Sequence, residues 1–217
     1  MVVEAVPLRA DAQRNLERIL EAARVVFAED GLDASVADIA ERAGVGTATI
    51  FRRFATKDDL CTAILERELE TIVARAREAA ESGDPAEALA DFMTWGVERF
   101  ISDRCLCEAG ESPIFMRPRI QELVAEVMAE MERVLRRGQK MGAIRRDVVA
   151  EDIGFLLGAI GHSGLRLERV APGAWRRYVT LVLDGLRAEG ATKLRQSPPT
   201  PQQVIAAKSA TPRASRP

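Results

Sequence analysis

The sequence is poor in aromatic residues, cysteine and histidine: its 217 residues include seven Phe, two Trp, one Tyr, three Cys and one His. Three cysteines, at positions 61, 105 and 107, make no disulfide framework, which favours a reducing cytoplasm. No apolar run approaches the ~20 residues of a membrane span, and the N-terminal MVVEAVPLRADAQR lacks a signal-peptide core. We therefore expect a globular cytoplasmic protein that does not associate with membranes.

Sites for metals or catalysis also lack their usual residues. Cys105-Leu-Cys107 with a single distant histidine, His162, does not supply the four ligands of a structural zinc site. No nucleophile, base and orienting group occur in a recognisable order. We expect no enzyme, no cofactor and no metal. Two alternatives remain: a thiol- or metal-responsive regulator acting through Cys105 and Cys107, and a helical enzyme.

The net charge of −2, from 31 basic and 33 acidic residues, gives no argument for nucleic-acid binding. Residues 9–58 hold eight basic and nine acidic side chains, so any basic surface there must come from segregation of charge by face. Residues 191–217 differ: they contain five basic residues, no acidic one and five of the ten prolines. This composition predicts a disordered basic tail, either a solvated appendage or a weak contact to nucleic acid.

Helical patterns fill most of the chain. Apolar residues recur at helical spacing from Leu16 to Phe27, and Ser35-Val-Ala-Asp38 and Thr56-Lys-Asp-Asp59 are typical capping boxes. Residues 104–118 are expected to be irregular. No segment has the alternation of a strand. We predict an all-α fold of about nine helices in three parts: an N-terminal three-helix domain over 9–56, a helical domain over 57–190 that begins with a connecting helix at 57–80, and the tail over 191–217.

A motif for nucleic-acid binding lies in the first of these parts. Ala40, Gly44 and Ile50 stand at relative positions 1, 5 and 11. The alanine lets two short helices approach, the glycine permits the tight turn, and the isoleucine buries the second helix against the first. This spacing indicates a helix-turn-helix, whose second helix, at about Gly46 to Arg53, would lie in the DNA major groove.

The run ILEAARVVFAEDGLDASVADIAERAGVGTATIFRRFATKDDL, residues 19–60, resembles the DNA-binding domain of the tetracycline-repressor (TetR) family. The resemblance rests on Ala22-Ala23, Phe27, Gly31, Asp38-Ile39-Ala40, Ala43-Gly44-Val45, Thr49-Ile50-Phe51, Phe54 and Lys57-Asp58-Asp59-Leu60. It implies a homodimeric transcriptional regulator, usually a repressor, that binds a near-palindromic double-stranded operator and is released from it by a small molecule. The C-terminal part would then bind the effector and form the dimer.

The resemblance also implies roles for particular residues. Base edges and phosphates would be reached from Thr47, Ala48 and Thr49, with Arg52 one turn further along the same face. Phosphates would also be met at the starts of two neighbouring helices, by Ser35 and Lys57.

Three positions depart from what is common in that family. Gly46 replaces a small polar residue, so the recognition helix has a weaker cap. Phe51 replaces a tyrosine, so a hydrogen bond to a phosphate is lost or reduced to packing. Arg53 replaces a frequent histidine and could restore a backbone contact. Ahead of the first helix, Arg9 and Arg14 either line the DNA from an arm or are ordinary surface residues.

In the C-terminal part, large apolar side chains are either core or the lining of an effector pocket, and both can hold together. The candidates are Phe92, Trp95, Phe100, Phe115, Met128 and Met131, which favour a mainly apolar effector. A second cluster resembles the family's four-helix dimer interface and consists of Gly154, Gly158, Gly161, His162, Leu181 and Val182. For His162, packing or an interface is the alternative to an effector contact.

Overall fold

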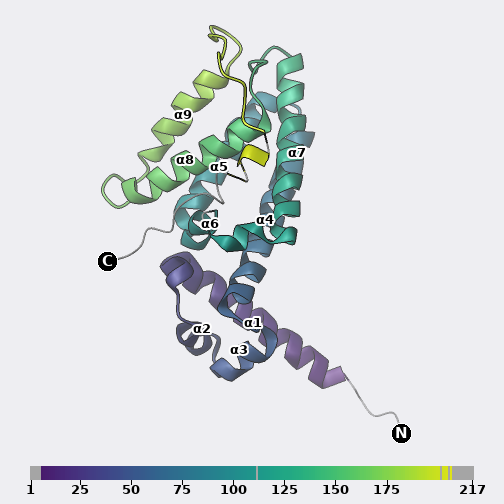
Figure 1. The fold of residues 1–217 in the computed structure, drawn as a ribbon, viewed down its shortest axis with the longest axis vertical. Helices are drawn as coiled ribbons and strands as arrows, with labels where there is room; N and C mark the ends of the chain where they lie inside the picture. The colour runs from purple at the N-terminus through teal and green to yellow at the C-terminus, as the bar shows by residue number, and fades with distance from the viewer. Residues whose placement is uncertain (1–5, 111, 201, 205, 207–217) are drawn as a thin grey trace.

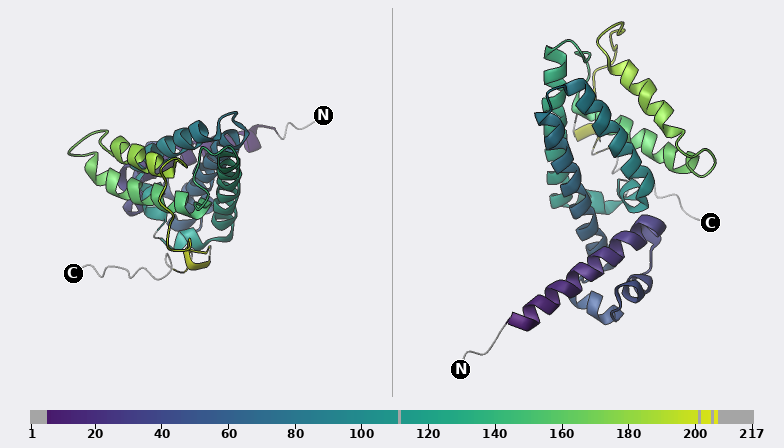
Figure 2. Two further views of the ribbon diagram at one scale, coloured as in Figure 1. Left: turned by 90° about the horizontal axis from the view of Figure 1, so that it is seen from above. Right: turned by 180° about the vertical axis from the view of Figure 1, so that it is seen from behind.

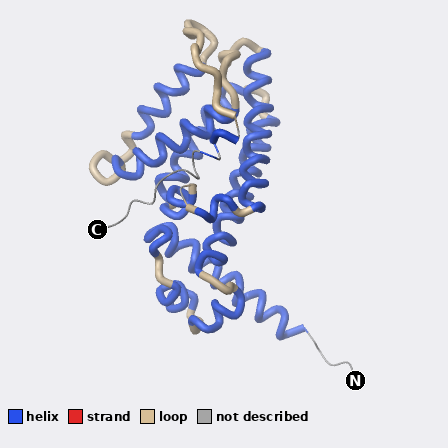
Figure 3. Tube along the Cα trace, viewed as in Figure 1, coloured by secondary structure: helices blue, strands red, loops and turns tan. Residues whose placement is uncertain are grey.

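The computed structural model describes residues 6–110, 112–200, 202–204 and 206, and over these residues the regular structure is helical (Figure 3), apart from an isolated bridge between Ile144 and Arg187. The predicted all-α class is confirmed. The elements of the described residues are α1 (Val6–Asp30), the 3-10 helix η1 (Gly31–Asp33), α2 (Val36–Ala43), α3 (Thr47–Arg53), α4 (Lys57–Glu81), α5 (Pro85–Ser102), α6 (Arg104–Ala109), the 3-10 helix η2 (Pro113–Met116), α7 (Pro118–Lys140), α8 (Ala150–Leu167) and α9 (Trp175–Leu186).

The helices form two groups joined by α4 (Figure 1). Helices α1, α2 and α3 make a small group at one end, and α5 to α9 make the larger group. The long helix α4 leaves the small group and runs beside α7, while α5 packs against α8 (Figure 2). A change in the packing around α4 therefore has a direct mechanical route to the small group.

The first helix starts earlier than its apolar pattern indicates. Apolar side chains recur from Leu16, but α1 already begins at Val6. Its buried face includes Ile19, Ala23 and Phe27, which pack into the continuous core of the molecule. Arg9 and Arg14 therefore lie within α1, and the expected arm ahead of the first helix is wrong as far as these two residues are concerned.

The cap of α4 is the one that the sequence predicts. Thr56 Oγ1 accepts a hydrogen bond from Asp59 N at 3.1 Å, and Asp59 Oδ2 accepts one from Thr56 N at 3.0 Å. This reciprocal pair satisfies two backbone N–H groups that the helix start leaves without a partner. It fixes where the small group ends and α4 begins.

The stretch 104–118, expected to be irregular, contains α6 and η2. The buried carboxylate of Asp103 caps α6 by accepting a hydrogen bond from Leu106 N at 3.0 Å. Burial raises the pKa of this carboxyl above its ordinary value. A helix of six residues is too short to show a repeating apolar face, so sequence periodicity could not reveal it.

The predicted tail over 191–217 lies partly outside the described residues. Its described start has no helix over residues 191–200 and is held by two hydrogen bonds. Leu194 N donates to Asp147 Oδ2 at 2.8 Å, and Arg145 Nη2 donates to Thr192 O at 2.5 Å. Disorder of this tail stays a prediction. Within the described part of the chain, no helix has the length and apolarity needed to span a bilayer.

Candidate nucleic-acid interface

The turn between α2 and α3 depends on Gly44. Its φ of +64° lies in the left-handed region, which a glycine adopts without steric cost. In this conformation Gly44 N donates to the carbonyl oxygens of Ala40 and Glu41 and closes the end of α2. Val45 N also donates to Ala40 O, at 3.0 Å. The turn thereby sets the direction in which α3 leaves α2.

Helix α3 packs by one side only. Ile50 is 1% exposed and packs with Ala40 of α2 in the core, as the spacing of the two residues predicts. The rest of the short helix faces outward: the exposed side chains are Thr47, Ala48, Phe51, Arg52 and Arg53, and Thr49 is half-buried. The predicted recognition residues are thus brought together on one free surface of one helix.

An internal hydrogen bond organises this surface. Arg52 Nη2 donates to Thr49 Oγ1 at 3.0 Å, one turn back along α3. Ala48 and Arg52, four residues apart, lie on the side of the helix away from Ile50. The guanidinium therefore extends beyond a small side chain and keeps donors available to a partner.

The two departures at the recognition helix have structural counterparts. Gly46 is the N-cap of α3 and provides no side-chain hydrogen bond to the first turn. Phe51 is 49% exposed, which is unusual for a phenyl ring on a polar helix face. Neither residue gives a side-chain hydrogen bond, so polar contacts from α3 fall to its threonines and arginines.

Two predicted phosphate contacts lie at helix starts near α3. Ser35 is the exposed N-cap of α2, and its Oγ accepts from Ala37 N at 3.0 Å, at the second helical position. Lys57, half-buried, is the first residue of α4 after the Thr56 cap. Both positions join a helix N-terminus to a polar or cationic side chain, a combination that suits an anion.

A residue that the sequence reasoning missed holds the turn from the side of α1. Arg18 Nη2 donates to Ala43 O at 2.6 Å, and its guanidinium also lies against Gly44. A Cβ at position 44 would be 2.7 Å from Arg18 Nη2. No local pattern distinguishes Arg18 from the other arginines of α1, because its partner is 25 residues away.

Two family models match this chain. Residues 19–64 match the model described as "Bacterial regulatory proteins, tetR family", and residues 84–188 match "Transcriptional regulator SbtR-like, C-terminal domain". The crystal structure of the TetR transcription regulatory protein from Mycobacterium vanbaalenii is 34% identical, with a TM-score of 0.59 over 83% of this chain and 99% of that one. The chain belongs to the TetR family. The predicted family, one of DNA-binding transcriptional regulators, is confirmed.

More distant relatives agree on parts of the chain. The HTH-type transcriptional regulator SAB2452 of Staphylococcus aureus is 36% identical over 72 residues, which is 33% of this chain and 39% of that protein. The match therefore spans about two fifths of that relative's length. The fold is also that of FadR from Bacillus subtilis in complex with stearoyl-CoA, which is 21% identical with a TM-score of 0.64 over 82% of this chain and 100% of that chain.

The candidate effector residues of this TetR-family chain lie in or against the core. Phe92 and Met131 are buried, and the rings of Phe92 and Trp95 are 6.2 Å apart between centroids. Three further candidates are partly buried against the same core: Phe100, Phe115 and Met128. Their role as pocket lining stays a prediction.

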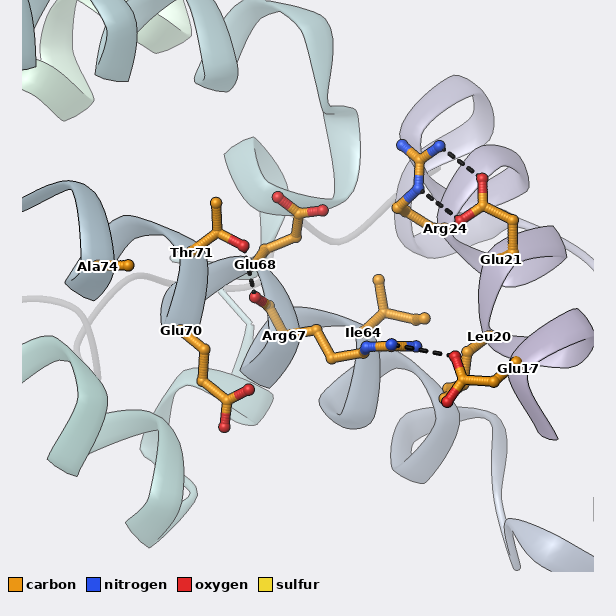
Figure 4. Close-up of a pocket in the computed structure, with 10 residues that line it drawn as sticks. All are labelled: Glu17, Leu20, Glu21, Arg24, Ile64, Arg67, Glu68, Glu70, Thr71 and Ala74. Atoms are coloured by element: carbon orange, nitrogen blue, oxygen red, sulfur yellow. Dashed lines mark hydrogen bonds and ion pairs between the residues drawn. The ribbon is translucent and has the colours of Figure 1, made fainter. Parts of the chain in front are cut away.

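A cleft of about 580 Å³ lies elsewhere, between α1 and α4 (Figure 4). It is lined mainly by charged side chains, and none of the predicted effector residues is among them. Arg67 of α4 reaches across it to Glu17 of α1 at 3.1 Å, while Arg24 pairs with Glu21 on α1 itself (Figure 4). The charge of this lining does not match the apolar effector that the sequence favours.

The candidate dimer residues fall into two sets. Gly161 faces Phe100 of the same chain, because a Cβ at position 161 would lie 2.7 Å from Phe100 Cβ. Gly154 faces Met128, and Val182 is partly buried against the core. By contrast, a Cβ on Gly158 would meet nothing within 4 Å, and Leu181 is 56% exposed.

His162, the last of the dimer candidates, is half-buried, and its Nδ1 lies 3.0 Å from Gly158 O.

The cysteines do not form the cluster that a metal site needs. Cys105 Sγ lies 3.7 Å from Cys61 Sγ of α4, and Cys61, Cys105 and Cys107 are all buried free thiols. The contact with Cys61 and burial both raise the pKa of the Cys105 thiol, which opposes formation of the reactive thiolate. Among the described residues, no group of three or more His, Cys, Asp and Glu side chains is placed to hold a metal ion.

Proposed function

We propose that this chain is a ligand-responsive transcriptional repressor that binds a near-palindromic DNA operator as a homodimer. The observation that carries the proposal is the free surface of α3, where Thr47, Ala48, Arg52 and Arg53 are exposed while Ile50 anchors the helix. We assign residues 9–56 to the DNA-binding domain, 57–190 to the effector and dimer domain, and 57–80 to the connecting helix.

Within the DNA-binding domain, α3 would enter the major groove with Thr47, Ala48 and Thr49 at base edges. Arg52 would add a base or phosphate contact on the same side, and Arg53 a contact to the backbone. Small side chains at the start of α3 favour close approach to bases, and the threonine methyl groups can contact the methyl group of thymine. Backbone contacts beside the groove, from Ser35 and Lys57, would fix the register without reading sequence.

Exposed apolar side chains on α8 and α9 support the dimer. Phe155 is 74% exposed, and Tyr178 and Leu181 are each at least half exposed. Gly158 leaves open space on the same helix as Phe155, which allows close approach of a partner helix. Burial of such a surface in a symmetric interface removes apolar area from water. A dimer would place two α3 helices in successive major grooves about 34–36 Å apart.

A mainly apolar small molecule is the effector that the core composition favours. Phe92, Trp95 and Phe115 belong to or pack against the continuous core of α4, α5, α7 and α8, so a ligand there would have to rearrange those helices. The fold of FadR from Bacillus subtilis, which this chain shares, accommodates stearoyl-CoA in that protein. Such a ligand would weaken operator binding only by favouring one packing over the other.

Two negative expectations complete the proposal. Family membership favours a regulator over an enzyme, and a DNA-binding function favours the cytoplasm. Regulation through Cys105 and Cys107 is not favoured, because both thiols are buried.

Selection from a random pool of duplex DNA with purified protein tests the proposal. We expect enrichment of an inverted repeat, whose genomic position would also point to the regulated genes. Recovery of unrelated sequences at moderate salt would contradict sequence-specific binding. A Trp95→Ala variant that keeps its full effector response would remove Trp95 from the proposed pocket.

A further inference from the structure

The short elements α6 and η2, together with Arg117 after η2, meet the start of the chain at two places. We call this set the α6–η2 corner. One contact joins Glu108 of α6 to the turn after α1, and the other joins Arg117 to the cap of α4. Both contacts connect the proposed effector domain to an end of the proposed DNA-binding domain.

The first contact is built around a carboxylate. Glu108 Oε2 accepts a hydrogen bond from Leu32 N at 2.8 Å, and Glu108 Oε1 accepts one from Arg104 Nε at 2.8 Å. Gly31 has a φ of +67°, and a Cβ added there would lie 2.4 Å from Glu108 Oε2. The turn at the end of α1 therefore needs glycine twice: once for its backbone and once to admit the carboxylate.

The second contact acts on the N-terminal cap of α4. Arg117 Nη1 donates to Asp59 Oδ1 at 2.8 Å, while the other carboxylate oxygen accepts from Thr56 N and Thr56 Oγ1 at 3.0 and 2.9 Å. One carboxylate thus holds both the guanidinium of the corner and the last residue of the proposed DNA-binding domain. Lys57, a proposed phosphate contact, directly follows that residue.

Other polar links between α1 and α4 are weaker in kind. Arg67–Glu17 spans the open cleft between α1 and α4, and both side chains are about half exposed (Figure 4). Exposed ion pairs of this type contribute little, because water and salt screen them. The carboxylate of Glu108 is less exposed and accepts from a backbone N–H, so its hydrogen bond is charge-assisted and fixes the direction of the chain.

We propose that Glu108 and Arg117 are positioning residues that together set the orientation of the DNA-binding domain relative to the effector domain. The inference rests on the proposed function and specifies how its two domains communicate. Phe115, a candidate pocket residue, lies between the two contacts in the chain, and its carbonyl oxygen accepts from Gln121 Nε2 at 2.6 Å. A ligand that displaces η2 would move Arg117, the next residue, and so loosen the cap of α4.

A distance measurement within one chain tests this role without DNA or effector. Spin labels would be attached at Glu41→Cys on α2 and Arg136→Cys on α7, two exposed positions. The three native thiols are buried, so they should not take up label. The doubly labelled chain would be diluted with unlabelled protein, so that pulsed electron resonance reports only distances within a protomer.

We expect Glu108→Ala and Arg117→Ala each to broaden the distance distribution, and the double variant to broaden it further. The matched controls, Glu122→Ala and Arg119→Ala, remove the same charges from α7, where the two residues pair with each other, and should leave the distribution unchanged. If an alanine variant does not fold, Glu108→Gln/Arg117→Gln keeps the side-chain volume and should still broaden it. A distribution as narrow as that of the unmodified chain in the folded double variant would overturn the proposal.

Operator affinity separates this inference from the proposed function. On a selected duplex, the double variant should bind about tenfold more weakly with the same dependence on salt, since neither residue would touch a phosphate. Unchanged affinity in a folded double variant would overturn the role in communication. If the unmodified chain selects no sequence but the double variant broadens the distribution, the proposed function fails while the positioning role is supported.

Discussion

The guanidinium of Arg18 on α1 donates a hydrogen bond to the carbonyl oxygen of Ala43, the last residue of α2, at 2.6 Å. This carbonyl belongs to the final turn of α2, where backbone oxygens lack helical partners and the helix dipole favours a positive charge. Arg18 thus connects the supporting helix α1 to the turn that aims α3. Its position suggests that it matters for DNA binding without touching DNA.

We expect Arg18→Ala to lower the free energy of unfolding by about 1–2 kcal/mol, because a charge-assisted hydrogen bond to the backbone is lost. Operator affinity should also fall, while the slope of affinity against salt stays the same. Arg24→Ala is the matched control: Arg24 lies on the same helix in an exposed pair with Glu21, and its loss should change stability little. A reduced salt slope in Arg18→Ala would place Arg18 on a phosphate instead.

Phe51 offers a test by gain of function. Phe51→Tyr adds a hydroxyl to an exposed ring on the proposed DNA face. We expect tighter operator binding, roughly fivefold, because a hydrogen bond to a phosphate is worth on the order of 1 kcal/mol net. Fluorescence anisotropy on a selected duplex measures the change. Equal affinities would show that the ring does not face the DNA backbone.

The three cysteines should be inert in the folded protein. Cys61, Cys105 and Cys107 are buried, and the pKa of Cys105 is raised. A chromogenic disulfide reagent at neutral pH should therefore detect no thiol in the native protein and three thiols after denaturation. Rapid reaction in the native state would revive regulation through these residues.

The pair Arg117–Asp59 predicts a dependence of stability on pH. Hydrogen bonding to Arg117, and after it to Thr56, holds the pKa of the Asp59 carboxyl below its usual range, which is about 3.9 for an unfolded chain. A carboxyl with a lowered pKa stabilises the fold at pH values above its unfolded pKa, and this contribution is lost as pH falls through the folded pKa. Thermal unfolding from pH 7 to pH 3 should therefore show a smaller acid loss in Arg117→Ala. Arg119→Ala should lose as much as the unmodified chain; if the two variants behave alike, the pair does not contribute.

The sequence predicted those features that depend on neighbouring residues. The Thr56–Asp59 cap, the glycine turn at Gly44 and the burial of Ile50 each follow from residues a few positions apart. For this reason the class of fold and the position of the recognition helix could be predicted. Family resemblance supplied the roles of the α3 residues, which periodicity alone does not give.

Contacts between distant parts of the chain could not be predicted. Arg18 meets Ala43 over 25 residues, Cys61 meets Cys105 over 44, and Glu108 meets Leu32 over 76. Such pairs depend on how helices pack, and local spacing carries no record of it. For the same reason Gly161 was taken for an interface residue, although in the fold it makes room for Phe100 of its own chain.

The most direct test of the central claim is a titration of a selected duplex with the unmodified chain and Arg52→Ala at several salt concentrations. We predict two protomers bound per duplex, on half-sites about 10–10.5 base pairs apart. We also predict weaker binding by Arg52→Ala, with a salt slope lower by about one if Arg52 contacts a phosphate, or relaxed sequence preference if it contacts a base. Binding that is independent of sequence, or an Arg52→Ala variant with unchanged affinity, salt slope and sequence preference, would contradict the account.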